Sequence, residues 1–487
     1  MAAVDNSKMK SVHSYDMFDT LVGRKCGNAK RLFAQIADIL EDPAFPEKRI
    51  AAERTLQQKR IEYSLDDIYS AYGDCTLAVV EFDLELHNVF PIKRYADRLT
   101  NDDIIVSDMY LSGNQLRQLL AAAGIKFTGR IYVSCCGKHT GDIWRNIKAN
   151  HLISTHRGDN IHNDIQKPKA HGIRTSLAET SFTKAEQFYA KHSEDLAYWL
   201  RHHRLEHITD ENKEHLNLLQ LEFNVSFLWA CSHLLAEHSH ENKLKKLLFM
   251  SRDNCMFQQL FQKLYPDVET EYLYVSREQL ISGSDSYFAY LNKRLTKDTS
   301  LVDLGASCGS LKAALPRLKV RNPRIWTAIY LQQPWNVDPR QIQLCYLTTN
   351  VNTTINNTFL EMLNYALHWH VADVDKNEQP HFDQENEYDM RLVEEYHLLF
   401  EKMLADAPAK NGTQLQPIIE YALTNIHRHG AFLRKMFPGH HRFESKRRKS
   451  LNFALPYGDK PESVASGGSS FGSRLSSERR KRISRLG

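Results

Sequence analysis

The stretch SYDMFDTL, which begins at Ser14, combines an apolar approach with closely spaced side chains that could do chemistry. Val12 and Tyr15 lead into Asp16, and Thr20 follows four positions later. This order predicts a short buried strand that delivers Asp16 at its carboxyl end. Open α/β sheets bind their ligands at that edge. Asp16 is therefore the first candidate for a nucleophile or a metal ligand.

Three further polar motifs follow at the ends of expected strands: Ser107 in IIVSD, Lys138 in GKHTGDIW, and Asp159 with Asp164 in GDNIHND. Each has an ordinary explanation when it is taken alone. Asp159 suits a turn, and Lys138 suits a solvated helix start. Ser107, followed by Asp108, suits a helix N-cap. Four motifs in this order at strand ends are nevertheless improbable by chance.

These residue types suit phosphoryl transfer. A carboxylate can attack a phosphoryl group and form an acyl-phosphate that water later hydrolyses. A hard cation relieves the repulsion between carboxylate and phosphate, and Mg²⁺ prefers a few carboxylates together with waters and substrate phosphate. Asp16 and Asp159 are the natural Mg²⁺ ligands, with Asp164 as a third ligand or an outer oxygen.

With these motifs in this order, the first third of the chain resembles the haloacid dehalogenase superfamily of aspartate-nucleophile hydrolases. The resemblance implies that Asp16 is the nucleophile and that the main-chain carbonyl of Phe18 also coordinates Mg²⁺. Ser107 would donate to a transferring phosphoryl oxygen, and Lys138 would neutralise the charge of Asp16 and phosphate. Thr20 would support the loop after the nucleophile. The expected substrate-binding residues of this half are Thr20, Ser107 and Asp108.

One position departs from the phosphatase pattern of this superfamily. The second residue after the nucleophile is there an aspartate that acts as general acid for the leaving group, whereas here it is Phe18. An aromatic residue at this position resembles the dehalogenase branch, while the GDNIHND pair favours the metal-dependent branch. Asp19 is the candidate replacement acid, and the inserted cap is the other source. General acid assistance contributes about 10²–10⁴-fold in rate, so without it the activity would be feeble.

Periodicity places the motifs in an α/β fold, with a Rossmann-like parallel sheet covered by helices on both faces. In the first half, strands are expected at 12–19, 103–107, 130–134, a shorter fourth segment ending at Gly158, and a fifth at Ile173 and Thr175. Residues 28–97 are too long for a simple crossover and, by resemblance, form a helical cap. In the second half, strands are expected at 246–250, 271–275, 301–304, 324–331 and 343–348, and mostly helices at 354–372 and 387–436.

The predicted organisation has five parts. They are a hydrolase domain over 1–178, with the cap insertion at 28–97, a helical connector over 179–240, a second α/β domain over 241–380, a helical C-terminal part over 381–444, and a basic disordered tail over 445–487.

The amino-acid sequences of the motifs resemble those of a narrower group, the two-part predicted hydrolases of bacterial surface-polysaccharide gene clusters. The strings that carry this resemblance are YDMFDTLVGR, IIVSDMYLS, FMSRD, YVSRE and VDLG. They span the region from residue 12 to residue 370 and imply a phosphorylated sugar, polyol or similar metabolite as substrate. The alternative is a catalytically weak binding or scaffold protein in polysaccharide or glycan assembly.

The second half carries a separate candidate site, whose members end or follow expected strands and could line one crevice: Arg252, Asp253, Arg277, Asp303 and Gly305. Arg252 and Arg277 suit a phosphate or carboxylate by bidentate pairing. The run VDLGASCG also resembles the first motif of adenosylmethionine-dependent methyltransferases, which would give this half a transferase activity. Gln332 and Gln333, however, stand where those enzymes place an acidic residue. An internal Arg–Asp ion pair in a structural or partner-binding domain is the alternative.

Composition limits the class of protein. With 487 residues, 42% hydrophobic and 25% charged, the chain is expected to be globular and to hold about three domains. We find no apolar run of about 18 residues and no signal peptide, so a cytoplasmic location is expected. Eight scattered cysteines indicate reduced thiols. Clustered histidines such as His233, His368 and His440 are expected to be solvated.

The charge is unevenly distributed along the chain. From Ser445 to Gly487, eleven Lys and Arg residues against three acidic ones give a net charge of +8, so residues 1–444 carry −4 of the total of +4. Such a tail can bind an anionic surface, including the inner face of the membrane, or a polyanion, or can merely solubilise the chain. Specific nucleic-acid recognition is not indicated, because few aromatic residues are interleaved with the basic ones.

Overall fold

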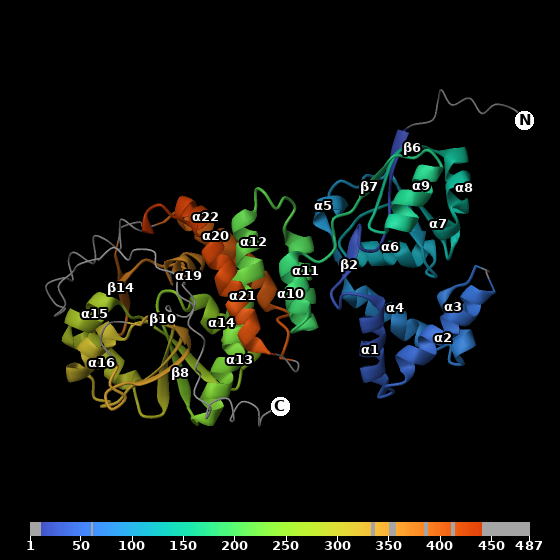
Figure 1. Cartoon of the computed structure of the whole chain (residues 1–487). Helices are drawn as coiled ribbons and strands as arrows, with labels where there is room; N and C mark the ends of the chain where they lie inside the picture. Colours follow the sequence, from blue (N-terminus) through green and yellow to red (C-terminus); the bar gives the residue numbers. More distant parts are fainter. Residues whose placement is uncertain are drawn as a thin grey trace, which may run out of the picture. The chain divides into compact units, whose positions relative to one another are not determined.

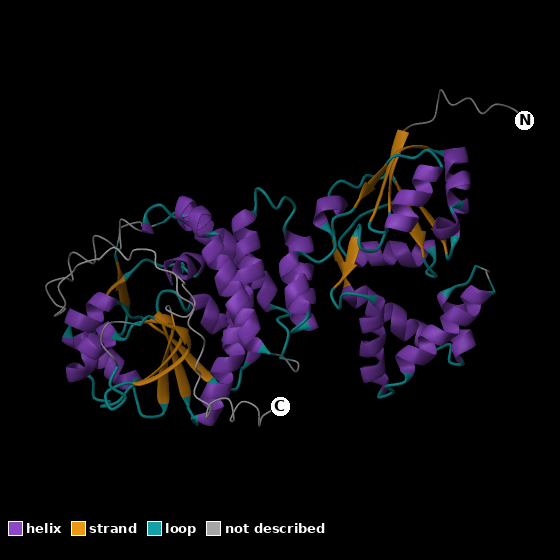
Figure 2. Cartoon of the chain, in the orientation of Figure 1, coloured by secondary structure: helices purple, strands orange, loops and turns teal. Residues whose placement is uncertain are grey.

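The computed structural model describes residues 11–59, 62–332, 337–349, 357–383, 388–410 and 414–440. These residues contain two five-stranded parallel sheets flanked by helices, which confirms the predicted α/β class (Figure 2). The predicted basic tail lies outside the described residues. No helix among the described residues is both long and apolar enough to cross a membrane.

The first sheet has the order β5-β4-β1-β6-β7 with every pair parallel. Its strands are β1 (Ser11–Tyr15), β4 (Ile104–Asp108), β5 (Arg130–Ser134), β6 (Leu152–Gly158) and β7 (Thr175–Leu177). The prediction of a shorter fourth strand was wrong. The strand β6 has seven residues because it pairs with β1 along the whole of that strand.

Different helices cover the two faces of this sheet (Figure 1). Leu116 and Leu119 of α6 (Gly113–Ala122) share a core with Ile105. Trp144 of α8 (Asp142–Asn150) shares another core with Ile104. Because side chains alternate along a strand, these two neighbours of β4 point to opposite faces. Burial on both faces explains why IIVSD is an almost continuous apolar run.

A helical insertion separates β1 from β4. It consists of α1 (Ala29–Leu40), α2 (Phe45–Gln58), α3 (Leu65–Tyr72) and α4 (Leu77–Asn88), which lie within the expected segment 28–97. The strands β2 (Val22–Arg24) and β3 (Val89–Pro91) pair antiparallel on either side of these helices. This pairing holds the two ends of the insertion together, and α5 (Lys93–Ala96) then leads back to the sheet.

A buried ion pair lies inside the insertion. Arg49 donates from Nε to Glu81 Oε2 at 2.7 Å, and the two residues are 0% and 1% exposed. The hydroxyls of Tyr69 and Tyr110 also donate to Glu81, at 2.6 and 2.9 Å. Buried charges need such partners to offset their lost hydration. Since Tyr110 follows β4, this network also fastens the insertion to the sheet.

The second sheet has the order β12-β11-β10-β8-β9 and is also parallel throughout. Its strands are β8 (Lys246–Met250), β9 (Glu269–Leu273), β10 (Thr299–Ala306), β11 (Arg324–Tyr330) and β12 (Gln343–Thr349), and its helices include α14 (Cys255–Leu264), α15 (Arg277–Ser282), α16 (Asp285–Arg294) and α17 (Gly309–Ala314).

An antiparallel pair of strands, β13 (Val371–Val374) and β14 (Pro380–Phe382), was not predicted. The turn between them contains Glu378, whose positive φ of 63° is compatible with a tight reversal of the chain.

Helices precede and follow the second sheet, as expected for residues 180–240 and 387–436. The first group is α10 (Lys184–Ala190), α11 (Glu194–His207), α12 (His215–Leu219), a π-helical turn over Gln220–Val225, and α13 (Ser226–Glu241). The second is α19 (Asn357–Leu363), α20 (Met390–Leu404), α21 (Leu415–Arg428) and α22 (Gly430–Met436). Both groups share one hydrophobic core with the second sheet.

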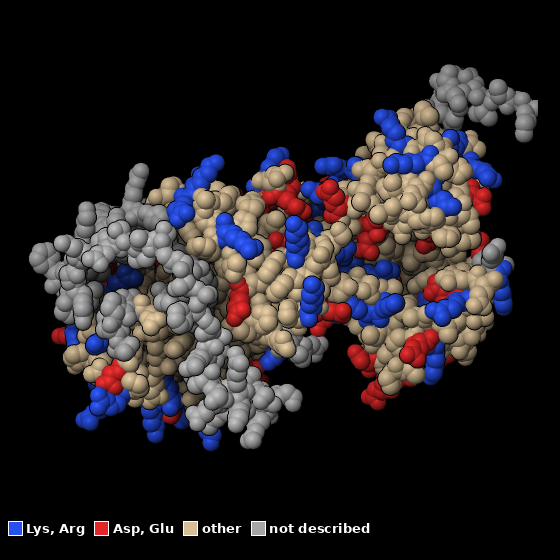
Figure 3. Space-filling model, viewed as in Figure 1, with Lys and Arg blue, Asp and Glu red and all other residues tan. Residues whose placement is uncertain are grey.

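Two histidines that were expected to be solvated are buried. His233 and His440 are each 1% exposed. His233 pairs with the hydroxyl of Tyr265, and His440 pairs with the hydroxyl of Tyr365. Each hydroxyl satisfies one ring nitrogen, and the other ring nitrogen of His440 lies 3.5 Å from a carboxylate oxygen of Glu361. On the face drawn in Figure 3, basic and acidic side chains are interspersed over the described elements.

We predict that Glu222→Gln stabilises the protein at pH 8 by up to about 3 kcal/mol and has little effect at pH 4. Glu222 is 7% exposed, and burial, reinforced by Glu186, raises its pKa from 4.5 to about 7. The folded chain therefore binds this proton more tightly than the unfolded chain. The resulting stabilisation is complete below pH 4.5 and is lost as the pH rises to about 7.

Chemical denaturation of the wild type and of Glu222→Gln at pH 4 and pH 8 measures the difference in their free energies of unfolding. Glu241→Gln, at an exposed position of α13, is the control. An effect of Glu222→Gln that is the same at pH 4 and pH 8 would contradict the prediction.

Candidate functional site

Asp16 lies immediately after β1 and is 8% exposed. Its backbone N–H donates to the carbonyl of Arg157 in β6 at 2.8 Å, so the chain remains paired one residue beyond the strand. From β1 the sheet continues to β4 on one side and to β6 on the other. Asp16 therefore stands at the point where the strand order reverses, which is where α/β sheets bind ligands.

Lys138 joins two carboxylates. Its Nζ lies 2.5 Å from Oδ1 of Asp16 and 2.5 Å from Oδ1 of Asp164. The residue belongs to α7 (Gly137–Thr140), which follows β5, and its Nζ also donates to the carbonyl of Val106 in β4 at 3.3 Å. Burial would lower the pKa of Lys138, but Asp16 and Asp164 outweigh it and raise the pKa above 10.5.

Asp108 positions the start of α7. Its Oδ1 accepts the backbone N–H of Lys138 at 3.0 Å, and its Oδ2 accepts that of His139 at 3.1 Å. The carboxylate, predicted to bind substrate, thus caps the turn that carries Lys138. Ser107, which precedes it, is 3% exposed and lines the same cavity as Asp16.

Asp164 is held by several donors. His156 Nε2 lies 3.2 Å from its Oδ1, and the N–H of Asn160 donates to its Oδ2 at 3.0 Å. Burial would raise the pKa of Asp164, but His156 and Lys138 lower it to about 2. Burial lowers the pKa of His156 to about 4, so the ring is neutral at pH 7. A neutral ring donates once, to Asp164, and its Nδ1 accepts from the Ser14 hydroxyl at 2.8 Å.

Gly158 allows Asp164 to fold back over the end of β6. A Cβ at position 158 would lie 2.3 Å from Cγ and 2.5 Å from Cβ of Asp164. Asp164 reaches this place from a π-helical turn over Ile161–Gln166, and the Asn160 side chain caps the start of that turn. The glycine of GDNIHND is therefore required by close packing.

Three carboxylates form a group that could hold a metal ion. Asp16, Asp159 and Asp164 offer ligand oxygens within 4.8 Å of one another. Burial and neighbouring carboxylates raise the pKa of Asp159 to about 6 and, against the opposing effect of Lys138, that of Asp16 to about 7. Hard oxygen donors and a local excess of negative charge fit Mg²⁺, because the cation would favour the ionised form of each carboxyl group.

The loop after β1 carries three other predicted residues. The guanidinium of Arg24 lies over the ring of Phe18, 3.9 Å from its centroid. Asp19 has a φ of 53°, and its Oδ1 accepts from Nη2 of Arg201 at 2.7 Å. Thr20 is fully buried, and its hydroxyl makes no hydrogen bond with the described residues. Asp19 is thus part of an ion pair, while Thr20 packs inside the loop.

A cavity of about 340 Å³ unites the sheet edge and the insertion. The predicted residues that line it together are Asp16, Ser107, Asp108, Lys138, Asp159 and Asp164, with Phe18 and Asp19 beside them. The insertion contributes Ala29 from α1 and Glu53 and Gln57 from α2, together with Tyr63. The insertion therefore forms part of the wall around the candidate nucleophile.

The residues of this site that were not predicted include Arg24, His156 and Arg201. His156 is buried between the half-buried Thr155 and Arg157 in β6, so strand periodicity was the available signal. Arg24 follows directly from the Asp16 motif, but only the fold shows that it returns to Phe18. Arg201 is 182 positions away from Asp19, and no local pattern indicates that contact.

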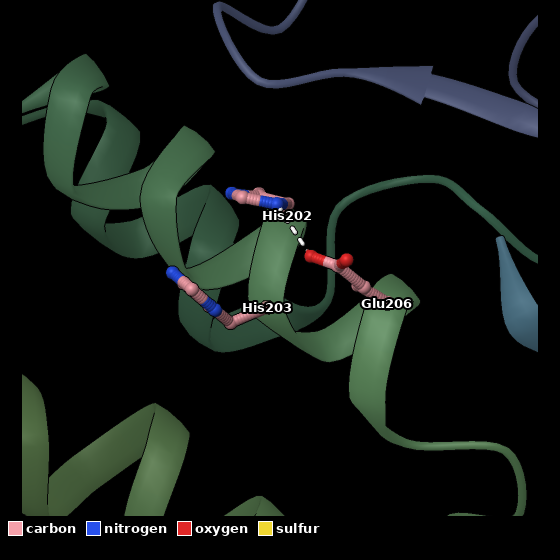
Figure 4. A group of neighbouring side chains, drawn as sticks. All are labelled: His202, His203 and Glu206. Carbon is pink, nitrogen blue, oxygen red and sulfur yellow. Dashed lines mark hydrogen bonds and ion pairs between the residues drawn. The ribbon is translucent and has the colours of Figure 1, made fainter. Parts of the chain in front are cut away.

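A second group with metal-ligand chemistry, also not predicted, lies on α11. His202, His203 and Glu206 have ligand atoms within 4.8 Å of one another, and Figure 4 shows His202 facing Glu206. His202 contacts Glu206 at 2.8 Å, and both rings contact Asp406, beyond the end of α20, at 3.1 and 2.7 Å. These nitrogens already have carboxylate partners, so the group is a hydrogen-bonded junction between α11 and the segment after α20.

The predicted residues of the second half gather at the ends of β8 and β10, which are neighbours at the reversal of the strand order. The guanidinium of Arg252, after β8, lies 5.0 Å from the ring centroid of Tyr365. Asp303 in β10 accepts the N–H of Gly305 at 3.3 Å, and burial raises its pKa to about 6. Arg277 begins α15 after β9, so it belongs to the same edge.

A comparison of the chain with models of protein families found no match, and a search of curated proteins found none either.

We predict that Gly158→Ala destabilises the protein by about 1–3 kcal/mol, because the added methyl group overlaps an Asp164 side chain that Lys138 and His156 hold in place. Gly113→Ala is the matched control, since its Cβ would meet nothing within 4 Å. Urea denaturation measures both changes. Equal effects of the two substitutions would mean that Asp164 can move aside at no cost.

Proposed function

We propose that the chain is a Mg²⁺-dependent phosphoryl hydrolase that acts through an aspartyl-phosphate on Asp16. One observation carries the proposal. Lys138 bridges Asp16 and Asp164 beside Asp159, at the reversal point of a parallel sheet and inside a cavity that an inserted segment covers. The resemblance of the motifs to the haloacid dehalogenase superfamily supports the same chemistry.

The roles follow from the positions of the side chains. An oxygen of Asp16 attacks phosphorus as the bond to the leaving group breaks, and water later cleaves the acyl-phosphate. Lys138 and Ser107 bind the transferring phosphoryl oxygens. Asp16, Asp159 and Asp164, with the carbonyl of Phe18, would hold Mg²⁺, which supplies charge neutralisation when it is bound.

The proposed substrate class and cellular setting rest on the amino-acid sequences of the motifs and their resemblance to the narrower group. This resemblance indicates a phosphorylated sugar, polyol or similar metabolite as substrate, and cytoplasmic glycan assembly as the setting. Arg252 and Arg277 in the second half would bind a further anionic group of a substrate or partner. The basic tail would contact an anionic membrane face or a polyanion.

A screen of phosphorylated metabolites with and without Mg²⁺ tests the proposal. We predict that Asp16→Asn lowers turnover by at least about 10³-fold, because an amide cannot form the acyl-phosphate. Asp38→Asn, at an exposed position of α1, is the control and should keep full activity. Turnover that survives Asp16→Asn, or that requires no metal, would exclude this mechanism and favour a binding or scaffold role.

Asp19 was the candidate general acid, and its contact with Arg201 generates a different expectation. In this contact Asp19 accepts a hydrogen bond from Arg201, so its side chain supports the conformation of the loop. We predict that Asp19→Asn slows hydrolysis of nitrophenyl phosphate and of a sugar phosphate by the same factor, through displacement of the loop. Steady-state rates on the two substrates measure this. A loss confined to the sugar phosphate would restore the acid role to Asp19.

A further inference from the structure

The side of the cavity opposite Asp16 determines which leaving group can depart. Phosphoryl transfer proceeds in line, so the leaving group lies away from the attacking carboxylate. Besides the residues of the sheet edge, Phe18, Arg24 and the insertion residues Glu53 and Tyr63 line this cavity. A proton for the departing oxygen would have to come from one of the described groups that line the cavity.

Three carboxyl groups of this cavity outside the Asp16, Asp159 and Asp164 group are already paired. Asp19 accepts from Arg201 at 2.7 Å. Glu53 accepts from Nη1 of Arg49 at 2.8 Å and also from the hydroxyl of Tyr63 at 3.2 Å. Asp108, at the sheet edge, uses both oxygens for backbone N–H groups. None of these described carboxylates is arranged as a proton donor.

The remaining hydroxyl and thiol groups are weak acids. The Tyr110 hydroxyl donates to Glu81 at 2.9 Å, and burial raises the pKa of Tyr110 well above 10. Burial raises the pKa of Tyr63 and that of Cys135 to about 12 each. General acids act best when their pKa lies near the working pH. These groups are therefore poorly suited to protonate an alkoxide at neutral pH.

Arg24 offers a different kind of assistance. Its Nε and Nη2 donate to Glu85 at 2.7–3.0 Å, which holds the guanidinium plane over Phe18. Its Nη1 makes no hydrogen bond with the described residues, and Arg24 lines the cavity. A guanidinium remains charged at neutral pH, so it can stabilise an anion but cannot act as a general acid. Its donor geometry matches phosphate.

Resting on the proposed function, we infer that the substrate is a phosphoanhydride and that Asp16 takes its terminal phosphoryl group. The leaving group is then a phosphate, which departs as an anion and needs no proton, and Arg24 binds it. A sugar or polyol that carries a diphosphate meets this requirement, whereas a simple phosphate ester of a sugar hydroxyl does not.

The step balances without a proton donor. A new bond forms between an Asp16 oxygen and the terminal phosphorus, while the bond from that phosphorus to the bridging oxygen breaks. The bridging oxygen keeps the electron pair and leaves as part of the shorter phosphate. Water then attacks the phosphorus and regenerates the Asp16 carboxylate, and its proton passes to solvent. Position 18 also lacks a carboxylate that could act as the base in this second step. Water therefore hydrolyses the aspartyl-phosphate slowly.

The experiment measures covalent labelling of the full chain. The protein is mixed with Mg²⁺ and either terminally labelled ADP or labelled glucose 6-phosphate, quenched in acid, and assayed for bound phosphate. ADP represents an anhydride and glucose 6-phosphate an ester of an alcohol. We expect ADP to label the chain at least about 100-fold faster, the scale of a missing general acid. Asp16→Asn should not be labelled by either compound.

The outcomes separate the inference from the proposed function. Labelling at similar rates by both compounds, dependent on Asp16, would overturn the anhydride inference and leave the hydrolase proposal intact. Labelling by neither compound, or labelling that survives Asp16→Asn, would overturn both.

Two variants test the residues that carry the inference. Phe18→Asp supplies the absent acid and should raise the labelling rate with glucose 6-phosphate more than the rate with ADP. The ratio of the ADP rate to the glucose 6-phosphate rate should therefore fall at least tenfold. Arg24→Gln combined with Glu85→Gln removes the guanidinium without leaving Glu85 as an unpaired buried charge. It should slow labelling by ADP more than labelling by nitrophenyl phosphate. Equal slowing of labelling by the two compounds would show that Arg24 does not bind the leaving group. If either variant fails to fold, the comparison of ADP with glucose 6-phosphate on the wild-type chain still tests the inference.

Discussion

The candidate site depends on a buried lysine held between two carboxylates. Removing an ammonium group and two carboxylates from water is costly, and their mutual attraction offsets that cost only when the geometry is close. Lys138 meets this condition because it contacts both Asp16 and Asp164. The site still carries more negative than positive charge, since Asp159 lies in the same group. This excess of negative charge would favour a divalent cation, and in the proposed function Lys138 would contact the phosphoryl group.

The backbone around the lysine is built to preserve that contact. Asp108 caps the short helix from which Lys138 extends, and so fixes where the long side chain begins. Gly158 leaves room for Asp164 to fold back over β6, while neutral His156 donates a hydrogen bond to it. None of these three residues needs to touch a substrate. Each limits the freedom of a group that would, and preorganised charges act without a reorganisation cost during reaction.

Helix α11 connects the loop after Asp16 to a distant part of the chain. Arg201 pairs with Asp19 in that loop, whereas His202 and His203 pair with Asp406 beyond α20. The indole of Trp199 on the same helix donates to the carbonyl of Met403. The candidate catalytic loop therefore contacts a helix of the connector, and that helix is held in turn by residues at and beyond the end of α20. This gives α11 a structural role beside the candidate site.

The sequence alone determined the α/β class and the strand-end residues of the first half. Buried parallel strands are continuous apolar runs, and a polar residue at the end of such a run marks the sheet edge, as Asp16 and Ser107 do. It could not reveal that His156 supports Asp164, that Arg24 covers Phe18, or that Arg201 holds Asp19. These contacts join segments with no shared periodicity, so they exist only once the sheet order and helix packing bring the segments together. The burial of His233 and His440 was likewise decided by tertiary structure, because a polar ring can be buried only where folding supplies a partner.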